Sequence, residues 1–249
     1  MLSNLGFRRP FRYSGGITRL PAAAMNFPLA SPPSSERPYG GRDHDARVSE
    51  RRERFIQAGV RVIGTAGYRA ATVRALCAEA GLSNRYFYEA FDSTEALLIE
   101  IYRTLMGECQ AAILTAMQQA PRELDAITAA GVRVFFEHAR DPLFARTTLL
   151  EVMGVSPAVD ALYEENIRVF GRVIMAGARS VMTADDLPEE EADMLGLSLV
   201  GALAYAAMHW MQDGYRLSVE QMVRNAVRII GGTALGIQQS LPSRGKQDD

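Results

Sequence analysis

Apolar residues recur at helical spacing along most of the chain after residue 48. The first series runs from Phe55 to Ala66, and Gly67 follows it as a stop signal. The second series places four apolar residues at positions i, i+3, i+4 and i+7: Val73, Leu76, Cys77 and Ala80. No alternation of apolar and polar residues is long enough for a β-sheet, so the pattern predicts an all-α protein.

The rear part of the chain predicts longer helices, separated by prolines and by an Asp-Gly pair. Pro121, Pro142 and Pro157 lie at the starts or ends of these helices, and Asp213-Gly214 separates the last two. The predicted helices cover residues 94–119, 122–139, 142–154, 157–182, 188–212 and 218–239. The sequence contains no internal repeat.

One of these helices contains eighteen residues without a formal charge, Met194 to Met211. This length just reaches the threshold for a membrane span. We favour a helix buried between neighbouring helices, with no membrane involved. Ser198 and His209 lower its hydrophobicity, and no Lys or Arg cluster flanks it. Its Gly and Ala residues would let another helix approach closely, which fits a homodimer interface. A membrane-attached protein is the alternative.

The first 47 residues lack apolar periodicity and contain six prolines. Such a segment cannot bury enough apolar surface to offset its loss of chain entropy. We therefore predict a disordered extension over residues 1–47, and a disordered tail over residues 241–249. The extension could be a basic arm that contacts phosphates, a passive tail, or the product of a start site placed too early, with Met25 as an internal candidate.

The composition is that of an ordinary globular protein, with 48% hydrophobic and 22% charged residues among 249. This length allows one or two domains. Two cysteines, Cys77 and Cys109, cannot build a disulfide framework and indicate a reducing, cytoplasmic setting. Cys109 and His138 have no third ligand at a suitable spacing, so we expect no metal and no cofactor.

The net charge of −2 conceals a gradient along the chain. Residues 1–47 carry seven Arg against three acids, or +4, and residues 48–91 carry seven against four, or +3. Residues 109–249 carry twelve basic and eighteen acidic residues, or −6. A basic front and an acidic rear suggest an anionic partner at the N-terminal end.

The segment from Thr72 to Phe91 has the outline of a helix-turn-helix. A helix of about nine residues leads to a turn at Gly81, and a second short helix follows, which in this motif enters the major groove of DNA. Ser83 is placed to cap the second helix through its hydroxyl. Leu82 and Phe87 occupy the positions of a hydrophobic staple, which turns Phe87 towards a small core.

Burial of Phe87 and Phe91 leaves five residues of the second helix facing outward: Asn84, Arg85, Tyr86, Glu89 and Ala90. Arg suits the two acceptors of guanine, Asn suits adenine, and Glu can accept from cytosine. The backbone N–H groups at the two helix starts and the hydroxyl of Tyr88 are suited to phosphate oxygens. The predicted DNA-contacting residues are Thr72, Arg74, Ser83, Asn84, Arg85, Tyr86, Tyr88 and Glu89.

Two alternatives concern the charges of this region. Arg85 could pair with Glu89 four residues on and do nothing else. Three further arginines near the start of the helical pattern could be a solvated charge run or could contact phosphates: Arg51, Arg52 and Arg54.

Residues 49–108 resemble the DNA-binding domain of the TetR family of transcriptional regulators. The residues that carry the resemblance are Arg51-Arg52-Glu53-Arg54, Ala66-Gly67-Tyr68, Ala71-Thr72-Val73-Arg74, Ala80-Gly81-Leu82-Ser83, Phe87-Tyr88, Phe91 and Glu95-Ala96-Leu97-Leu98. The resemblance implies phosphate contacts by Thr72 and Tyr88. It implies base contacts by Asn84, Arg85 and Tyr86.

The resemblance also implies the layout of the chain. A three-helix DNA-binding domain is expected over residues 48–108, with the helix-turn-helix at residues 72–91, and a larger helical ligand-binding and dimerisation domain over residues 109–240. Two positions depart from the family pattern: Thr94 stands where many members have Lys, and Ala90 where many have His. One phosphate contact and one polar contact are therefore weakened or lost.

The function implied by the resemblance is regulation of transcription by sequence-specific binding of double-stranded DNA. We expect a homodimer that is joined through the last two helices and acts as a repressor on a palindromic operator. We expect its DNA binding to be regulated by a largely apolar small molecule. The expected pocket residues are Phe135, Phe144, Met153, Phe170, Tyr205, Met208 and His209. An activator of the same fold is an alternative. An enzyme is disfavoured, because the sequence has no phosphate-binding loop, nucleophile elbow or metal motif.

Overall fold

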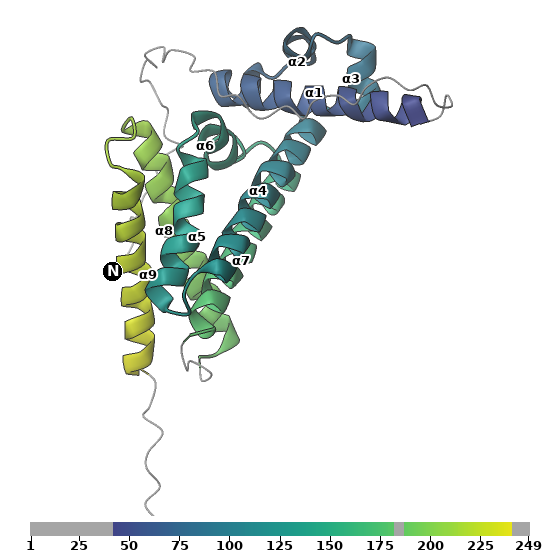
Figure 1. The fold of residues 1–249 in the computed structure, drawn as a ribbon. Coiled ribbons are helices and arrows are strands. Elements are labelled where there is room, and N and C mark those ends of the chain that lie inside the picture. The colour runs from purple at the N-terminus through teal and green to yellow at the C-terminus, as the bar shows by residue number, and fades with distance from the viewer. Residues whose placement is uncertain (1–41, 182–186, 241–249) are drawn as a thin grey trace, which may run out of the picture. The chain divides into compact units, whose positions relative to one another are not determined.

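The computed structural model describes residues 42–181 and 187–240, and throughout these ranges the regular structure is helical, which confirms the all-α prediction. The elements are α1 (Arg42–Ala66), the 3-10 turn η1 (Tyr68–Ala70), α2 (Val73–Ala80), α3 (Asn84–Ala90), α4 (Thr94–Gln119), α5 (Leu124–Ala139), α6 (Pro142–Leu149), α7 (Pro157–Arg179), α8 (Glu189–Gln212) and α9 (Val219–Ser240) (Figure 1). Most of the predicted extension, residues 1–41, and the predicted tail, residues 241–249, lie outside the described residues.

Two helix boundaries differ by five or more residues from those that the apolar pattern predicts. α1 begins at Arg42, so residues 42–47, which the pattern assigns to a disordered extension, are helical. Residues 45–50 are all exposed and leave no apolar periodicity to read; they prolong a helix whose buried turns begin at Phe55. α6 ends at Leu149 instead of residue 154, because the chain turns there and Gly154 adopts a left-handed φ of 74°.

The first three helices pack around aromatic side chains. The rings of Phe55 on α1 and Phe87 on α3 meet edge to face with their centroids 5.3 Å apart. Leu76 on α2 is fully buried in the same cluster, and the ring of Phe91 lies 6.0 Å from that of Phe87. Figure 1 shows α2 and α3 lying against α1. This core confirms the predicted inward positions and fixes the orientation of α3.

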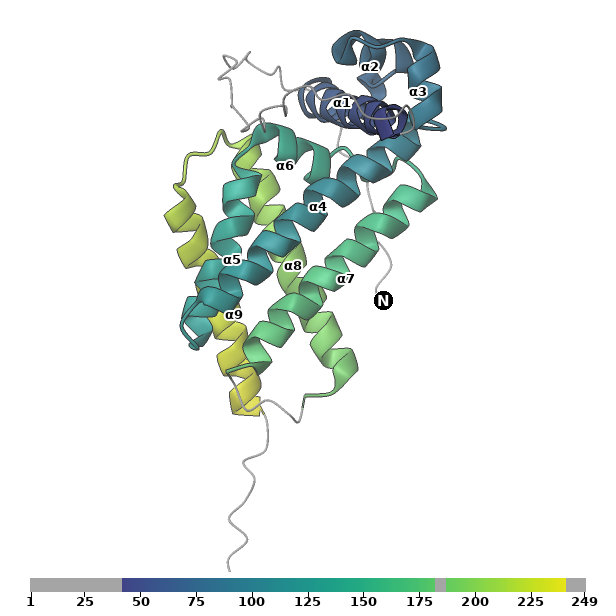
Figure 2. The same ribbon diagram turned by 45° about the vertical axis from the view of Figure 1, so that its right-hand side comes forward.

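Five long helices form most of the remaining described chain. α4 packs against α5 and α7, α7 against α8, and α5 against α9 (Figure 2). A second cluster of buried apolar side chains lies among α5, α6, α8 and α9, where the rings of Phe136 and Trp210 meet edge to face at 5.9 Å. The indole Nε1 of Trp210 donates to the carbonyl of Leu217 at 2.9 Å, which fixes the turn between α8 and α9.

α8 buries only one of its faces. Leu199, Leu203 and Trp210 are buried, whereas Met194 and Tyr205 are exposed. By length and composition α8 would suffice to span a membrane, but the same test is passed by core helices, and a third of its apolar stretch is buried. The prediction of a helix packed between neighbours is confirmed for one face of α8, and no described helix covers the other face.

Replacing Gly196 by alanine is expected to destabilise the fold. A Cβ on Gly196 of α8 would lie 2.8 Å from the carbonyl oxygen of Gly171 on α7, so two helix backbones would have to separate. Overpacking of this kind costs about 1–3 kcal/mol. Gly107→Ala is the control: a Cβ there meets nothing, and the better helix former should stabilise by about 0.5–1 kcal/mol. Urea unfolding measures both, and equal stabilities of the two variants would contradict this account.

Candidate nucleic-acid interface and cavity

α2 is held at both ends by local contacts. The hydroxyl of Thr72, the N-cap residue, accepts a hydrogen bond from the backbone N–H of Ala75 at 3.2 Å. At the other end Gly81 adopts a left-handed φ of 64°, which a residue with a Cβ rarely tolerates. The backbone N–H of Leu82 then donates to the carbonyl of Cys77 at 3.0 Å, so the turn into α3 is fixed.

α3 begins at Ser83 without the side-chain cap that the sequence predicts. Ser83 is the N-cap residue and its backbone carbonyl accepts from Phe87 N–H at 3.3 Å, but its hydroxyl makes no capping hydrogen bond. The start of α3 is supported instead by Leu82 and Phe87, which pack into the same apolar cluster. The exposed hydroxyl of Ser83 is therefore not engaged as a helix cap.

Arginines of α1 clamp the helix-turn-helix. Arg54 Nη2 donates to the carbonyl of Ala80 at the end of α2, and Arg52 Nη1 donates to the carbonyl of Ala90 at the end of α3, both at 2.6 Å. The Arg52 guanidinium also lies 4.4 Å from the ring centroid of Phe91. These two side chains satisfy carbonyl groups that a helix C-terminus leaves unpaired. Arg52 and Arg54 therefore have a structural role. The sequence had suggested only a solvated charge run or phosphate contacts for them.

The first turn of α3 presents exposed polar groups. Asn84 is exposed, and the Arg85 side chain is 85% exposed. Arg85 Nε donates to Glu89 Oε1 at 2.9 Å, and this hydrogen bond together with the carboxylate charge raises the pKa of Arg85. Tyr88 is 60% exposed on the neighbouring flank. The predicted pairing of Arg85 with Glu89 is thus present, and it holds the guanidinium at the surface of α3.

Tyr86 is less open than the sequence predicts. It is half-buried against the apolar cluster, and the guanidinium of Arg51 lies 4.3 Å from the centroid of its ring. Arg51 Nη1 also lies 4.0 Å from Glu89 Oε2. The prediction that Tyr86 faces outward is only partly correct, because Arg51 of α1 covers one side of its ring.

The remaining predicted contact residues lie at the surface near the start of α2. Thr72 and Arg74 are both exposed. Thr94 stands where Lys is common in the family that the sequence resembles. It is half-buried, and its hydroxyl lies 3.4 Å from the hydroxyl of Tyr68. This side chain therefore connects the start of α4 to η1.

A pair of charged residues ties α6 to the end of α1. Arg146 Nη1 donates to the carbonyl of Thr65 at 2.7 Å, and its Nε donates to Glu151 Oε1 at 2.9 Å. The other carboxylate oxygen of Glu151 accepts from the backbone N–H of Tyr68 at 2.8 Å. This Arg146–Glu151 clamp fixes the chain where α1 ends and η1 begins. It joins the helix-turn-helix to the helices behind it.

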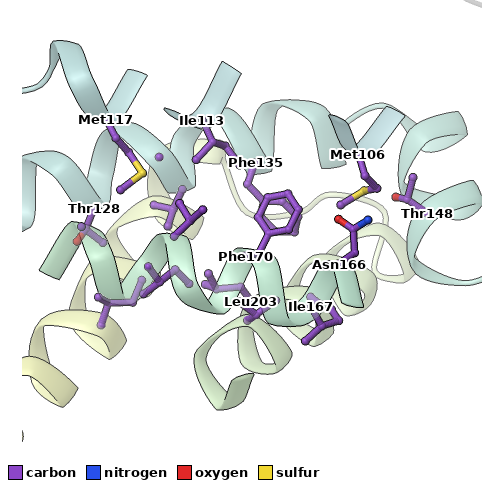
Figure 3. A pocket seen from close by; sticks show the side chains of 18 of the residues that line it. Met106, Ile113, Met117, Thr128, Phe135, Thr148, Asn166, Ile167, Phe170 and Leu203 are labelled. Atoms are coloured by element: carbon purple, nitrogen blue, oxygen red, sulfur yellow. The ribbon is translucent and has the colours of Figure 1, made fainter. Parts of the chain in front are cut away.

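An apolar cavity lies between α4, α5, α7 and α8. It is narrow, with a water-accessible volume of about 80 Å³. Figure 3 shows Met106, Thr148 and Asn166 at one end and Met117 at the other, with Phe170 between them. No charged side chain of the described residues lines it. Such a cavity suits an apolar small molecule.

Neutral polar groups gather at the end of the cavity that Met106 marks. Tyr102 and Tyr163 lie there with their ring centroids 6.4 Å apart, and the side chains of Thr148 and Asn166 also line the wall. Burial raises the pKa of Tyr102 well above its ordinary range and also raises the pKa of Tyr163. Both phenols therefore stay protonated, and this end of the cavity disfavours negative charge.

Two of the predicted pocket residues lie on the wall of this cavity, Phe135 and Phe170. Five lie elsewhere: Phe144, Met153, Tyr205, Met208 and His209. Phe144 is buried in the core shared with the helix-turn-helix. Met153 is 49% exposed in the turn after α6, and Tyr205 is 67% exposed on the uncovered face of α8. These five assignments to the pocket are therefore wrong for this cavity.

The sequence pattern did not mark several residues that do line the cavity. They are Met117 on α4, Ile167 and Gly177 on α7, and Val200 and Leu203 on α8. Helical spacing shows that such residues share a face with others, but it does not show which neighbouring helix that face meets. The small residue Gly177 matters for a different reason, because a Cβ there would lie 2.6 Å from Cε of Met117.

The two cysteines are buried side chains of the core. Cys109 is fully buried, and burial raises the pKa of its thiol to about 12. Burial also raises the pKa of Cys77. Both thiols therefore stay protonated at neutral pH and are poor nucleophiles. In residues 42–181 and 187–240, no three His, Cys, Asp or Glu side chains lie close enough together to hold a metal ion.

The chain matches one curated relative along much of its length. It is 29% identical over 139 residues to the HTH-type transcriptional regulator BetI of Rhizobium meliloti (strain 1021), an alignment that covers 55% of this chain and 68% of BetI. The name of this relative describes it as a helix-turn-helix regulator.

The fold is similar to those of solved regulators. A transcriptional regulator from Pseudomonas aeruginosa PAO1 matches with a TM-score of 0.67 and 20% identity, over 80% of this chain and 99% of that one. FadR from Bacillus subtilis, solved in complex with stearoyl-CoA, matches with a TM-score of 0.60 and 17% identity, over 72% of this chain and 96% of that one. These similarities show a shared fold.

A capped helix, a left-handed glycine turn and a second helix with an exposed polar first turn define a helix-turn-helix DNA-binding protein. Residues 55–101 match the family model for bacterial regulatory proteins of the tetR family. Residues 55–101 therefore resemble the DNA-binding domain of tetR-type regulators, and the curated relative BetI is itself a transcriptional regulator.

Proposed function

We propose that this regulator is a homodimeric repressor that binds a palindromic operator through α3. The observation that carries the proposal is the exposed first turn of α3, where Asn84 and Arg85 project from a helix that the α1 arginines and the aromatic core hold rigidly. Arg85 would exchange Glu89 for the two acceptors of guanine, and Asn84 would read adenine. Thr72, Arg74, Ser83 and Tyr88 would contact the adjoining phosphates.

The uncovered faces of the last two helices support a dimer. α8 exposes Met194, Leu197 and Tyr205, and α9 exposes Ile229 and Leu235. Both helices also carry exposed glycines at which a Cβ would meet nothing within the protomer: Gly201, Gly232 and Gly236. An apolar surface with room for close backbone approach suits a second copy of the same helices. A dimer would place two α3 helices on two half-sites about one helical turn of DNA apart.

The cavity supports a small-molecule effector that changes operator affinity. Thr148 of α6 lines the cavity, and two residues earlier Arg146 holds the end of α1. A ligand that shifts α6 would therefore move the Arg146–Glu151 clamp and the helix-turn-helix with it. The effect on DNA binding equals the difference in ligand affinity between the two arrangements. The solved FadR with stearoyl-CoA shows that a related fold takes up a ligand with a long acyl chain.

The layout and setting follow from the same proposal. Residues 48–108 form the DNA-binding domain, and residues 109–240 form the ligand-binding and dimerisation domain. The protein acts in the cytoplasm, where a bacterial regulator meets the chromosome.

Selection of bound fragments from a random DNA library tests the proposal. We expect the selected fragments to share two inverted half-sites, and gel shifts at fixed salt to show a preference of at least a thousandfold over unrelated DNA. Selected fragments without inverted symmetry, or affinity that is equal for every sequence, would contradict it.

Arg85→Ala is expected to weaken operator binding by about 1–3 kcal/mol and to relax the preference at one base position in each half-site. The physical reason is the loss of a bidentate contact with a guanine. Arg103→Ala, which removes the same charge from an exposed site on α4, is the matched control and should bind as the wild type does. Equal affinity and unchanged preference for Arg85→Ala would show that the assignment of Arg85 is wrong.

Thr72→Ala is expected to weaken binding nearly equally on operator and unrelated DNA, because a phosphate contact carries no sequence information. The same change removes the hydrogen bond to Ala75 N–H and should lower stability by about 1 kcal/mol. Thr72→Ser keeps the hydroxyl and serves as the control. Gel shifts and urea unfolding measure the two effects, and a loss confined to the operator would contradict a phosphate contact.

A further inference from the structure

A second, wider pocket between α4, α5 and α7, called the mouth here, adjoins the cavity at its Met117 end. Cavity and mouth share four lining residues: Met117, Ile127, Val173 and Gly177. The mouth is more exposed to solvent, and it is lined by two charged side chains, Arg122 and Arg172, and by no acid among the described residues. The mouth is therefore positively charged, whereas the cavity itself is lined by no charged side chain in the described part of the chain.

Both arginines are held at the mouth by other groups. Arg122 Nη2 donates to the carbonyl of Ser180 at 3.3 Å, which ties the loop before α5 to the end of α7. Arg172 Nη2 donates to Glu165 Oε1 at 3.0 Å; Glu165 lies two turns earlier on α7. A guanidinium carries five N–H donors, so these single contacts leave further donors for an anion.

Met117 lies between the two spaces. A Cβ on Gly177 would come within 2.6 Å of Met117 Cε, and a Cβ on Gly131 within 3.1 Å of its Sδ. The thioether therefore occupies a slot that exists only because α5 and α7 carry glycines at these two positions. A methionine side chain is flexible and can leave such a slot when a ligand enters.

The dimensions of the cavity favour a long, slender ligand. Met106 and Met117 mark its two ends and are eleven residues apart on α4, so roughly 16 Å of helix separates them. The wall between them is apolar, and the far end offers only neutral groups around Tyr102 and Asn166. An ionised head buried at that end would have no charge partner, which is prohibitive. A charged ligand must therefore keep its head at the mouth.

We propose that the effector is an amphipathic anion, whose long alkyl chain lies along the cavity past Met117 and whose carboxylate or phosphate group is bound by Arg122 and Arg172. This inference rests on the proposed function, because it names the ligand class of the same effector site. The head group could be the carboxylate of a free fatty acid or the phosphates of an acyl thioester carrier. Both ligands have an anionic group and a long alkyl chain. They differ in the distance between the anionic group and the chain.

Isothermal titration of the full chain with palmitate, palmitoyl-CoA and hexadecanol tests the proposal. We expect at least one of the two anions to bind about tenfold or more tightly than hexadecanol, which has the same chain and no charge. The tighter of the two anions identifies the source of the head group. Shortening the chain of that ligand should weaken binding about fourfold for each CH₂ removed. Hexadecanol binding as tightly as both anions, or no binding of any probe, would overturn the proposal.

An Arg122→Gln, Arg172→Gln double variant separates the head from the chain. It should bind the preferred anion about tenfold more weakly and bind hexadecanol as the wild type does. Arg168→Gln is the matched control, because Arg168 lies on α7 beside Glu164 and Glu165 but does not line the mouth. Unchanged anion affinity in the double variant, or an equal loss for hexadecanol, would overturn the head-group site.

Operator binding by the same ligand-free proteins distinguishes this inference from the proposed function. The double variant should bind operator DNA as the wild type does, because Arg122 and Arg172 lie outside the helix-turn-helix. Intact operator binding with no binding of any probe overturns the ligand class alone. Failure of the wild type to prefer any DNA sequence overturns the proposed function itself.

Discussion

A Tyr205→Glu, Leu235→Glu double variant is expected to be a monomer that has lost most of its operator affinity. Tyr205 is 67% exposed on α8 and Leu235 is 55% exposed on α9, so the changes leave the protomer core intact. In a dimer the two carboxylates would have to lose their water among apolar side chains, which is strongly unfavourable. A monomer also loses the increase in operator affinity that comes from binding two linked half-sites at once, which amounts to about 10²- to 10⁴-fold.

Light scattering during gel filtration gives the oligomeric state, and gel shifts give the affinity. Met153→Glu is the matched control, because Met153 is also an exposed apolar residue but lies outside α8 and α9. It should remain dimeric and bind the operator normally. A double variant that stays dimeric, or a monomer with wild-type operator affinity, would refute the proposed assembly.

Phe87→Ala is expected to unfold the helix-turn-helix and abolish DNA binding. Phe87 is fully buried, and its ring contacts those of Phe55, Tyr88 and Phe91. Removing a buried aromatic ring costs about 3–5 kcal/mol, a large part of the stability of a small three-helix unit. Circular dichroism during urea unfolding would show an early transition that the wild type lacks.

Tyr88→Ala is the comparison for Phe87→Ala, because the neighbouring ring is mostly exposed. It should leave the unfolding curve close to that of the wild type and weaken binding to all DNA sequences through a lost phosphate contact. If Phe87→Ala left both stability and operator binding intact, the packing of α3 described above could not be what positions the recognition surface.

The helix-turn-helix could be predicted from the sequence because its signals are local. Thr72 caps α2, Gly81 ends it in a left-handed conformation, and the staple of Leu82 and Phe87 starts α3, all within about fifteen residues. The capping hydroxyl of Ser83 was the exception. Its residue type suits a cap, but its hydroxyl makes no capping hydrogen bond in the structure.

The arginine contacts could not be predicted because their partners are distant in the sequence. Arg54 binds a carbonyl 26 residues away and Arg52 one 38 residues away. A run of arginines at the start of a helix is typical of a solvated surface, and only the packing of α1 across the ends of α2 and α3 gives it a structural role. The same holds for Tyr86, whose cation partner comes from α1.

The pocket was predicted poorly for a related reason. Aromatic residues of the rear helices are spaced to share faces, but the spacing does not distinguish a cavity wall from a core or from a surface left for a second chain. Tyr205 lies exposed on α8 and Phe144 lies in the core, whereas Phe135 and Phe170 line the cavity. Which face of α8 turns inward is decided by the close approach of Gly196 to Gly171.

In the proposed complex, α3 reads the major groove of the operator with Arg85. Methylation interference on the selected operator tests it most directly, because a methyl group on guanine N7 blocks the contact at the major-groove edge. We predict interference at one guanine in each half-site, with the two guanines about one helical turn apart, and loss of that interference for Arg85→Ala. Interference confined to the minor groove, or a pattern that Arg85→Ala leaves unchanged, would contradict the account.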